Sequence, residues 1–101
     1  MANEIHVGDI GTQLLITILD DGLPVDVSDA IVLRITIKRP DGTLIIASGS
    51  LHTNGEDGVI YYTIVLGDLN QSGVYKIQAY VELIDGSYYS NIGSFSVKCN
   101  L

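Results

Sequence analysis

The chain has 101 residues, of which 47% are hydrophobic and only 17% charged, which excludes a disordered protein and predicts one folded domain over residues 1–101. Twelve acidic and five basic residues give a net charge of −7, which argues against a nucleic-acid partner because phosphate binding needs a basic surface. No apolar run approaches the ~18–20 residues of a membrane helix, so we expect no membrane partner.

We expect no secretory signal in the N-terminal segment, because Met1–Ile5 has neither a basic region nor an apolar one. The next stretch spells D-I-G-T from residue 9, as do phosphate loops of sugar-kinase and actin-like ATPases, and it is close to the aspartic-protease motif. Both enzyme classes need a second lobe or subunit. We therefore favour a turn between two strands, in which Gly8 and Gly11 break the chain direction and Asp9 accepts hydrogen bonds from nearby amides. An aspartate-dependent enzyme, which Asp9→Asn would inactivate, stays as an alternative.

Period-two alternation of apolar and polar residues dominates the rest of the chain and predicts strands without any helix. Turn clusters rich in Gly, Asp, Asn and Pro separate the strands at residues 20–24, 39–42, 54–58, 67–73 and 84–87. The predicted strands cover residues 4–7, 12–19, 31–39, 43–48, 58–66, 74–83 and 88–98. About seven short strands in ~100 residues predict an all-β, immunoglobulin-like antiparallel β-sandwich. Cys99 is the single cysteine, so the sandwich has no internal disulfide.

The stretch LNQSGVYKI, residues 69–77, supports this fold class. In immunoglobulin domains a tyrosine follows a turn and precedes the second disulfide cysteine by two residues. Gly73, Tyr75 and Ile77 take the places of the turn glycine, the tyrosine and the cysteine. We expect the Tyr75 hydroxyl to fold back onto the turn backbone and Ile77 to fill the core where the cysteine would lie.

Residues that carry chemistry are few. His6 and His52 lie far apart without a neighbouring Cys or His, which argues against zinc, and the nucleophile motif G-x-S-x-G is missing. The acidic turns at 20–26 and 54–57 are weak calcium candidates, because neither has the D-x-D-x-D-G spacing. We therefore expect no enzyme, no metal and no cofactor.

The basic residues are distributed unevenly. If the apolar residues of strands 31–39, 74–83 and 88–98 point inward, then Arg34, Lys38, Lys76 and Lys98 point outward by parity, together with Tyr80. In an immunoglobulin topology these strands are neighbours, so the five side chains share one face. That face is either a solvated surface seeded with lysine or an interface for an acidic surface, such as the turn end of another copy. A carbohydrate-binding sandwich using Tyr80 or Tyr88 is the alternative function.

Several motifs resemble the phage baseplate upper protein N-terminal family over nearly the whole chain and in the right order. The family pattern is V-G-D-x-G-T, V-D-L-S-x-A, K-P-D-G-T, G-x-x-x-Y and D-L-x-x-x-G-x-Y/W-x-x-Q. Its places are occupied in turn by Val7–Thr12, Val25–Ala30, Arg39–Thr43, Gly58–Tyr62 and Asp68–Gln78, with Val27 in place of Leu and Arg39 in place of Lys. The resemblance implies an immunoglobulin-like sandwich that anchors parts of a phage virion.

The resemblance also sets the expected role and partners. Larger family members continue into a linker and a trimeric stem, whereas this sequence ends at Leu101. We expect a small accessory component of the tail, neck or baseplate, or a capsid decoration protein, that docks in multiple copies. The expected partners are other virion proteins and further copies of the chain, in a virion assembled in the host cytoplasm.

Overall fold

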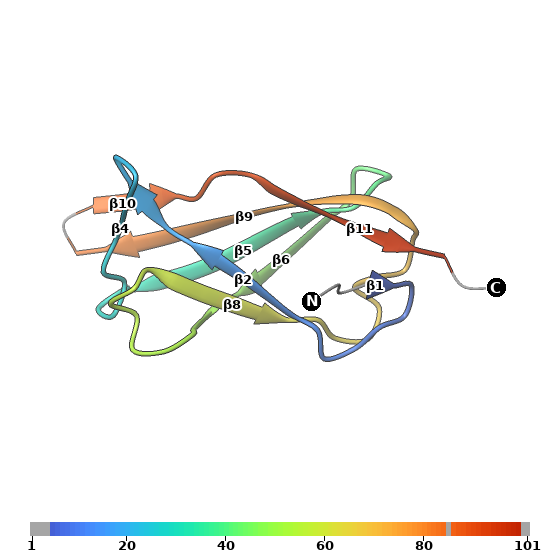
Figure 1. The fold of residues 1–101 in the computed structure, drawn as a ribbon, viewed down its shortest axis with the longest axis horizontal. Helices are drawn as coiled ribbons and strands as arrows, with labels where there is room; N and C mark the ends of the chain where they lie inside the picture. The colour runs from blue at the N-terminus through green and yellow to red at the C-terminus, as the bar shows by residue number, and fades with distance from the viewer. Residues whose placement is uncertain (1–4, 85, 100–101) are drawn as a thin grey trace.

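The computed structural model describes residues 5–84 and 86–99, and within them it contains strands and turns but no helix (Figure 1). The all-β prediction is confirmed for this part of the chain. It contains eleven strands rather than about seven. They are β1 (Ile5–His6), β2 (Gln13–Thr17), β3 (Leu19–Asp20), β4 (Leu23–Pro24), β5 (Val32–Lys38), β6 (Leu44–Ser48), β7 (Ser50–Leu51), β8 (Val59–Thr63), β9 (Gly73–Leu83), β10 (Gly86–Tyr89) and β11 (Gly93–Lys98).

The larger sheet has the strand order β1-β11-β9-β5-β6, and β10 forms a hairpin with β9. Its neighbours are antiparallel except for β1 and β11, which run parallel with Ile5 opposite Val97 and His6 opposite Lys98. The expectation of a purely antiparallel fold is therefore wrong at this ladder. Hairpins force antiparallel pairing only on consecutive strands, and β1 and β11 come from opposite ends of the described chain.

The smaller sheet has the antiparallel order β2-β8-β7, and the hairpin β3–β4 belongs to neither sheet. In Figure 1 the smaller sheet lies in front of the larger one. The chain passes from the larger to the smaller sheet at Gly49, between β6 and β7. A side chain there would meet Ile35 Cδ1 at 3.2 Å and Ile60 Cδ1 at 3.3 Å, so the crossing is tightly packed.

The core draws on both sheets. On each long strand every second side chain points inward, as the alternation in the sequence predicts. The buried apolar side chains are Ile5, Ile18, Val27, Ile35, Ile37, Ile60, Ile64, Leu69, Tyr75, Ile77, Ala79, Val81 and Val97. Ile31, expected on the inward face, is instead 65% exposed because it precedes the first residue of β5.

Two local differences from the predicted strands matter for the surface. The last predicted strand, 88–98, is divided at Ser90, whose Oγ accepts a hydrogen bond from Ala79 N at 2.8 Å and donates one to Asn91 O at 2.9 Å. This break turns β10 back onto β9 and lets β11 begin at Gly93. The turn cluster at 20–24 is itself the β3–β4 hairpin.

Candidate docking surface

The D-I-G-T stretch forms the connection between β1 in the larger sheet and β2 in the smaller one. Asp9 Oδ2 accepts a hydrogen bond from His6 N at 2.9 Å, while Asp9 N donates to His6 O at 3.1 Å. Gly8 and Gly11 have φ of 89° and 91°, in the left-handed region that glycine adopts most easily. Gly11 N donates to Ile64 O at 2.8 Å, which ties the turn to the end of β8. In this arrangement the Asp9 carboxylate closes a turn.

Tyr75 lies at the start of β9 with its ring fully buried. Its hydroxyl donates a hydrogen bond to Gln71 O at 2.7 Å and accepts one from Gln71 N at 3.2 Å. The ring stacks on Phe95 of β11 with centroids 5.2 Å apart. Gly73, with φ of 131°, precedes it, and a side chain there would meet Pro40 Cγ at 2.9 Å. Tyr75 thus joins the turn at 67–72 to the core.

A second polar cluster, which the sequence analysis missed, lies around the buried Asp68. Its Oδ2 accepts hydrogen bonds from the Tyr62 hydroxyl at 2.5 Å and from Val65 N at 3.0 Å. Burial, followed by the hydrogen bond to Asp68 and the charge of Asp68, raises the pKa of Tyr62 to about 12. The Arg39 guanidinium donates to Asp68 O at 3.1 Å and to Gly67 O at 3.3 Å. Arg39 therefore stabilises the turn at residues 67–68. It does not belong to the group that the other four basic residues form.

Those four basic residues lie on one side of the larger sheet. Strands β11, β9 and β5 are neighbours, and the registers place Arg34 opposite Tyr80 and Lys38 directly opposite Lys76. Ser94 lies opposite Lys76, and Lys98 follows on the same face of β11 four residues later. The Arg34 guanidinium sits over the Tyr80 ring, 4.7 Å from its centroid. We call this surface, formed by the outward side chains of β5, β6, β9, β10 and β11 and by Ile92 before β11, the basic face.

The basic face also carries apolar side chains that the sequence analysis did not assign to it. They are 54–66% exposed and come from β6, β9, β10 and the break before β11: Leu44, Ile46, Val74, Tyr89 and Ile92. The parity of β6 was a usable signal for Leu44 and Ile46, because Lys38 pairs with Leu44 and Thr36 with Ile46. Exposed apolar groups gathered beside polar and charged ones are typical of a protein interaction site.

Two hollows mark this surface. The first, about 290 Å³, is lined mainly by Thr36, Lys38, Leu44, Lys76, Gln78 and Ile92, and we call it the lysine hollow. The second, about 240 Å³, is lined mainly by Arg34, Thr36, Ile46, Gln78, Tyr80 and Tyr89. The Tyr80 and Tyr89 rings lie 4.9 Å apart at the second hollow, and Tyr88 points to the other face and packs against the core. The two tyrosines of the carbohydrate alternative are therefore on different faces of the sheet.

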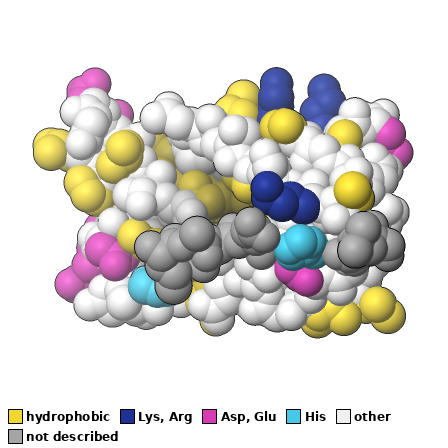
Figure 2. Space-filling view, turned by 45° about the vertical axis from the view of Figure 1, so that its right-hand side comes forward, with side chains coloured by type: hydrophobic (Ala, Val, Ile, Leu, Met, Phe, Trp, Pro, Cys, Tyr) yellow, Lys and Arg dark blue, Asp and Glu magenta, His cyan; other side chains and the backbone are white. Residues whose placement is uncertain are grey.

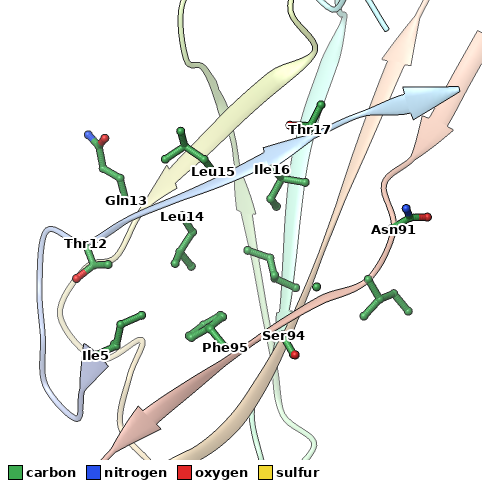
Figure 3. A pocket seen from close by; sticks show the side chains of 13 residues that line it. Ile5, Thr12, Gln13, Leu14, Leu15, Ile16, Thr17, Asn91, Ser94 and Phe95 are labelled. Carbon is green, nitrogen blue, oxygen red and sulfur yellow. The ribbon is translucent and has the colours of Figure 1, made fainter. Parts of the chain in front are cut away.

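A larger groove than these two hollows lies elsewhere, between β2 at the edge of the smaller sheet and β11 of the larger one (Figure 3). It has a volume of about 810 Å³. Leu14, Ile16 and Phe95 point into the space between the sheets, whereas Gln13 and Leu15 point away from it. The described residues that line the groove include no acidic, basic or histidine side chain, so they offer no general acid or base.

Metal and membrane chemistry find no support in residues 5–84 and 86–99. These residues contain no group of three or more His, Cys, Asp or Glu side chains placed to hold a metal ion. They also contain no helix that is long and apolar enough to cross a membrane. His52 instead packs edge-on against the Tyr61 ring, with centroids 6.4 Å apart.

Comparison with known proteins identifies a family. The sequence profile of the family described as the BppU N-terminal domain matches residues 2–100, which is nearly the whole chain. No curated protein and no solved structure gives a significant match.

Proposed function

Since the chain belongs to the BppU N-terminal domain family, the N-terminal domains of phage baseplate upper proteins, we propose that it is a non-enzymatic structural component of the baseplate that docks onto neighbouring virion proteins. The chain is thus a phage baseplate protein and part of the virion. Beyond this, we propose the docking role, the surface that performs it and the presence of several copies in the particle.

The fold proposed for this role is a single immunoglobulin-like sandwich. The strand order supports this assignment if β1, β11, β9, β5 and β6 are taken as strands A′, G, F, C and C′, and β2, β8 and β7 as B, E and D, with β3, β4 and β10 as additions. The hydroxyl of Tyr75 bonded to the backbone of the turn before strand F supports the same assignment. One core that draws on strands from β1 to β11 supports a single domain.

The observation that carries the proposal is the composition of the basic face. Arg34, Lys38, Lys76 and Lys98 form no ion pair with any carboxylate among the described residues. The like charges of Lys38 and Lys76 lie directly opposite each other, a pairing that weakens a sheet unless an outside group compensates for it. Exposed aliphatic side chains surround them. Such a surface is best explained by a partner that supplies carboxylates and apolar groups.

The test is a charge reversal on this face. The double variant Arg34→Glu with Lys76→Glu should fold normally, because both side chains are exposed, and should fail to enter phage particles. The measurement is the amount of the protein in purified particles, with circular dichroism to confirm folding. A control variant, Gln13→Glu with Thr17→Glu, adds negative charge to the outer face of the smaller sheet and should assemble normally. Normal assembly of the first variant would overturn the assignment of the interface.

A further inference from the structure

The β3–β4 hairpin is a small projection that neither sheet uses. It pairs only Leu19 with Pro24 and Asp20 with Leu23, and it lies at the left-hand end of the molecule in Figure 1. Asp21 and Gly22 form its two-residue loop with φ of 51° and 79°, the positive pair that a tight hairpin turn requires. The turn fixes the hairpin geometry, so its tip presents a defined set of side chains.

The tip combines two acidic with two apolar groups. Leu19 and Leu23 are 39% and 69% exposed, and Asp20 and Asp21 lie between them in sequence and are also exposed. The Asp20 and Asp21 carboxylates form no hydrogen bond or ion pair with any described residue. The tip therefore has charge and apolar area that the fold itself does not use.

Neighbouring acidic residues differ from the tip, because their own turns occupy them. Asp26 Oδ1 accepts hydrogen bonds from the Ser28 hydroxyl at 2.7 Å and from Ser28 N at 2.9 Å, and these bonds lower the pKa of Asp26. Asp57 accepts from Val59 N at 3.1 Å and from Thr53 Oγ1 at 3.0 Å, and the bond from Val59 N is the main cause that lowers its pKa. These two carboxylates shape loops, whereas Asp20 and Asp21 remain available for a partner.

The lysine hollow has the opposite character. Lys38 and Lys76 supply two cations without an internal carboxylate partner among the described residues, and Leu44 and Ile92 supply exposed aliphatic walls. Thr36 and Gln78 add hydrogen-bonding groups between the lysines and the tyrosines. The two cations and two aliphatic walls of the lysine hollow are therefore complementary to the two carboxylates and two leucines of the hairpin tip.

The two surfaces lie at opposite parts of an elongated molecule. The principal extents are 48 × 28 × 23 Å. In Figure 1 the hairpin is at the left, while β5 ends and β9 begins in the right-hand half. In Figure 2 every visible Lys or Arg side chain is in the right-hand half, and the left-hand end shows acidic side chains without any visible Lys or Arg. The hairpin of one copy therefore cannot reach the lysine hollow of the same copy, but the hairpin of a second copy can.

We propose that the β3–β4 hairpin of one copy inserts its tip into the lysine hollow of a second copy, with Asp20 and Asp21 against Lys38 and Lys76 and with Leu23 against the aliphatic walls. This proposal rests on the proposed docking role of the basic face and names the partner surface. Because the two contacting surfaces differ, the contact is head-to-tail and leaves a free hairpin and a free hollow on each pair. Repetition of the contact produces a ring or an open array of copies.

The proposal predicts an unusual dependence on salt. Two molecules of net charge −7 repel each other, and at ~0.01 M salt the screening length of about 30 Å lets this repulsion act between whole molecules. At ~0.15 M the length is about 8 Å, which suppresses the overall repulsion but preserves close ion pairs. At ~1 M even close exposed pairs are weakened. Association should therefore be strongest at intermediate salt.

The experiment is a charge swap followed by sedimentation velocity of the purified chain. We expect the unmodified chain to associate at high concentration and ~0.15 M salt, and Asp20→Lys or Lys76→Glu alone to weaken association about tenfold or more. Mixing these two variants should restore association, because the two reversed charges then face each other in one contact and the original groups meet in the next. Glu56→Lys changes the net charge by the same amount as Asp20→Lys, but in a neighbouring turn, and should have little effect.

Each other outcome contradicts the proposal. Equal weakening by Glu56→Lys and Asp20→Lys would show a general charge effect and exclude the hairpin as the specific contact. Failure of the mixture to restore association would exclude the pairing of the two surfaces. If the unmodified chain stays monomeric at every salt concentration while Arg34→Glu with Lys76→Glu is lost from particles, the hollow receives a different baseplate protein. In that case the docking role stands and the contact between copies is wrong.

Discussion

Tyr75 joins a buried ring to a hydroxyl that bonds both backbone groups of Gln71. Tyr75→Phe would keep the ring and its stacking on Phe95 but leave the N–H and the carbonyl of Gln71 without their protein partner. We expect the free energy of unfolding to fall by about 1–3 kcal/mol, as measured by urea denaturation. The exposed Tyr89 provides the control, since Tyr89→Phe should change stability by less than about 0.5 kcal/mol. Equal effects of the two substitutions would contradict the structural role of the Tyr75 hydroxyl.

The hydrogen bond from Tyr62 to Asp68 makes stability depend on alkaline pH. The pKa of Tyr62 is raised to about 12 in the folded chain from its ordinary value of 10.0. Between these values the unfolded chain loses the phenolic proton first, so the stabilisation is complete below pH 10 and is lost as the pH rises towards 12. We expect urea denaturation to show this loss, and Tyr62→Phe to reduce it. An unchanged slope in Tyr62→Phe would mean that other groups cause the alkaline loss.

At the scale of single elements, the β3–β4 hairpin separates folding from docking. Leu23 is 69% exposed and is not part of the core, so Leu23→Ser should leave the free energy of unfolding within about 0.5 kcal/mol. The same substitution should weaken self-association in sedimentation experiments, because it removes the apolar group of the proposed contact. Leu66, 82% exposed in a turn outside the hairpin, is a matched control. Leu66→Ser should alter neither property, and equal weakening by both variants would exclude a specific contact.

The long strands were predictable from the sequence because each has enough residues for period-two alternation to stand out. Residues 12–19, 31–39 and 74–83 became β2, β5 and β9 with ends shifted by at most two residues. The hairpin strands β3 and β4 have two residues each, too few to show a period. The break at Ser90 depends on a hydrogen bond with Ala79 of a neighbouring strand, which no local pattern reveals.

At the scale of the whole molecule, the cationic part of the basic face was predictable, whereas the apolar part was predictable only where it lies on β6. The four bases follow from parity on three strands that the topology makes neighbours. The apolar part needs the place of β6 beside β5, and it needs the break that exposes Ile92. The acidic end of the molecule, which carries the turns at residues 20–26 and 54–57, depends on segments that are distant in sequence. They meet through a hydrogen bond from Val27 N to Gly55 O at 2.8 Å. Such contacts between distant segments are set by the complete fold.

The parallel ladder between β1 and β11 also determines when the larger sheet is completed. Ile5 and Val97 are among the first and the last described residues, so their pairing requires a very long loop closure. During folding, β10 covers Tyr80–Leu83 of β9, but the part of the same edge at Gly73–Ile77 stays unpaired until β11 docks on it. This unpaired part of the edge is therefore where β9 is most exposed to mispairing, and the docking of β11 closes it.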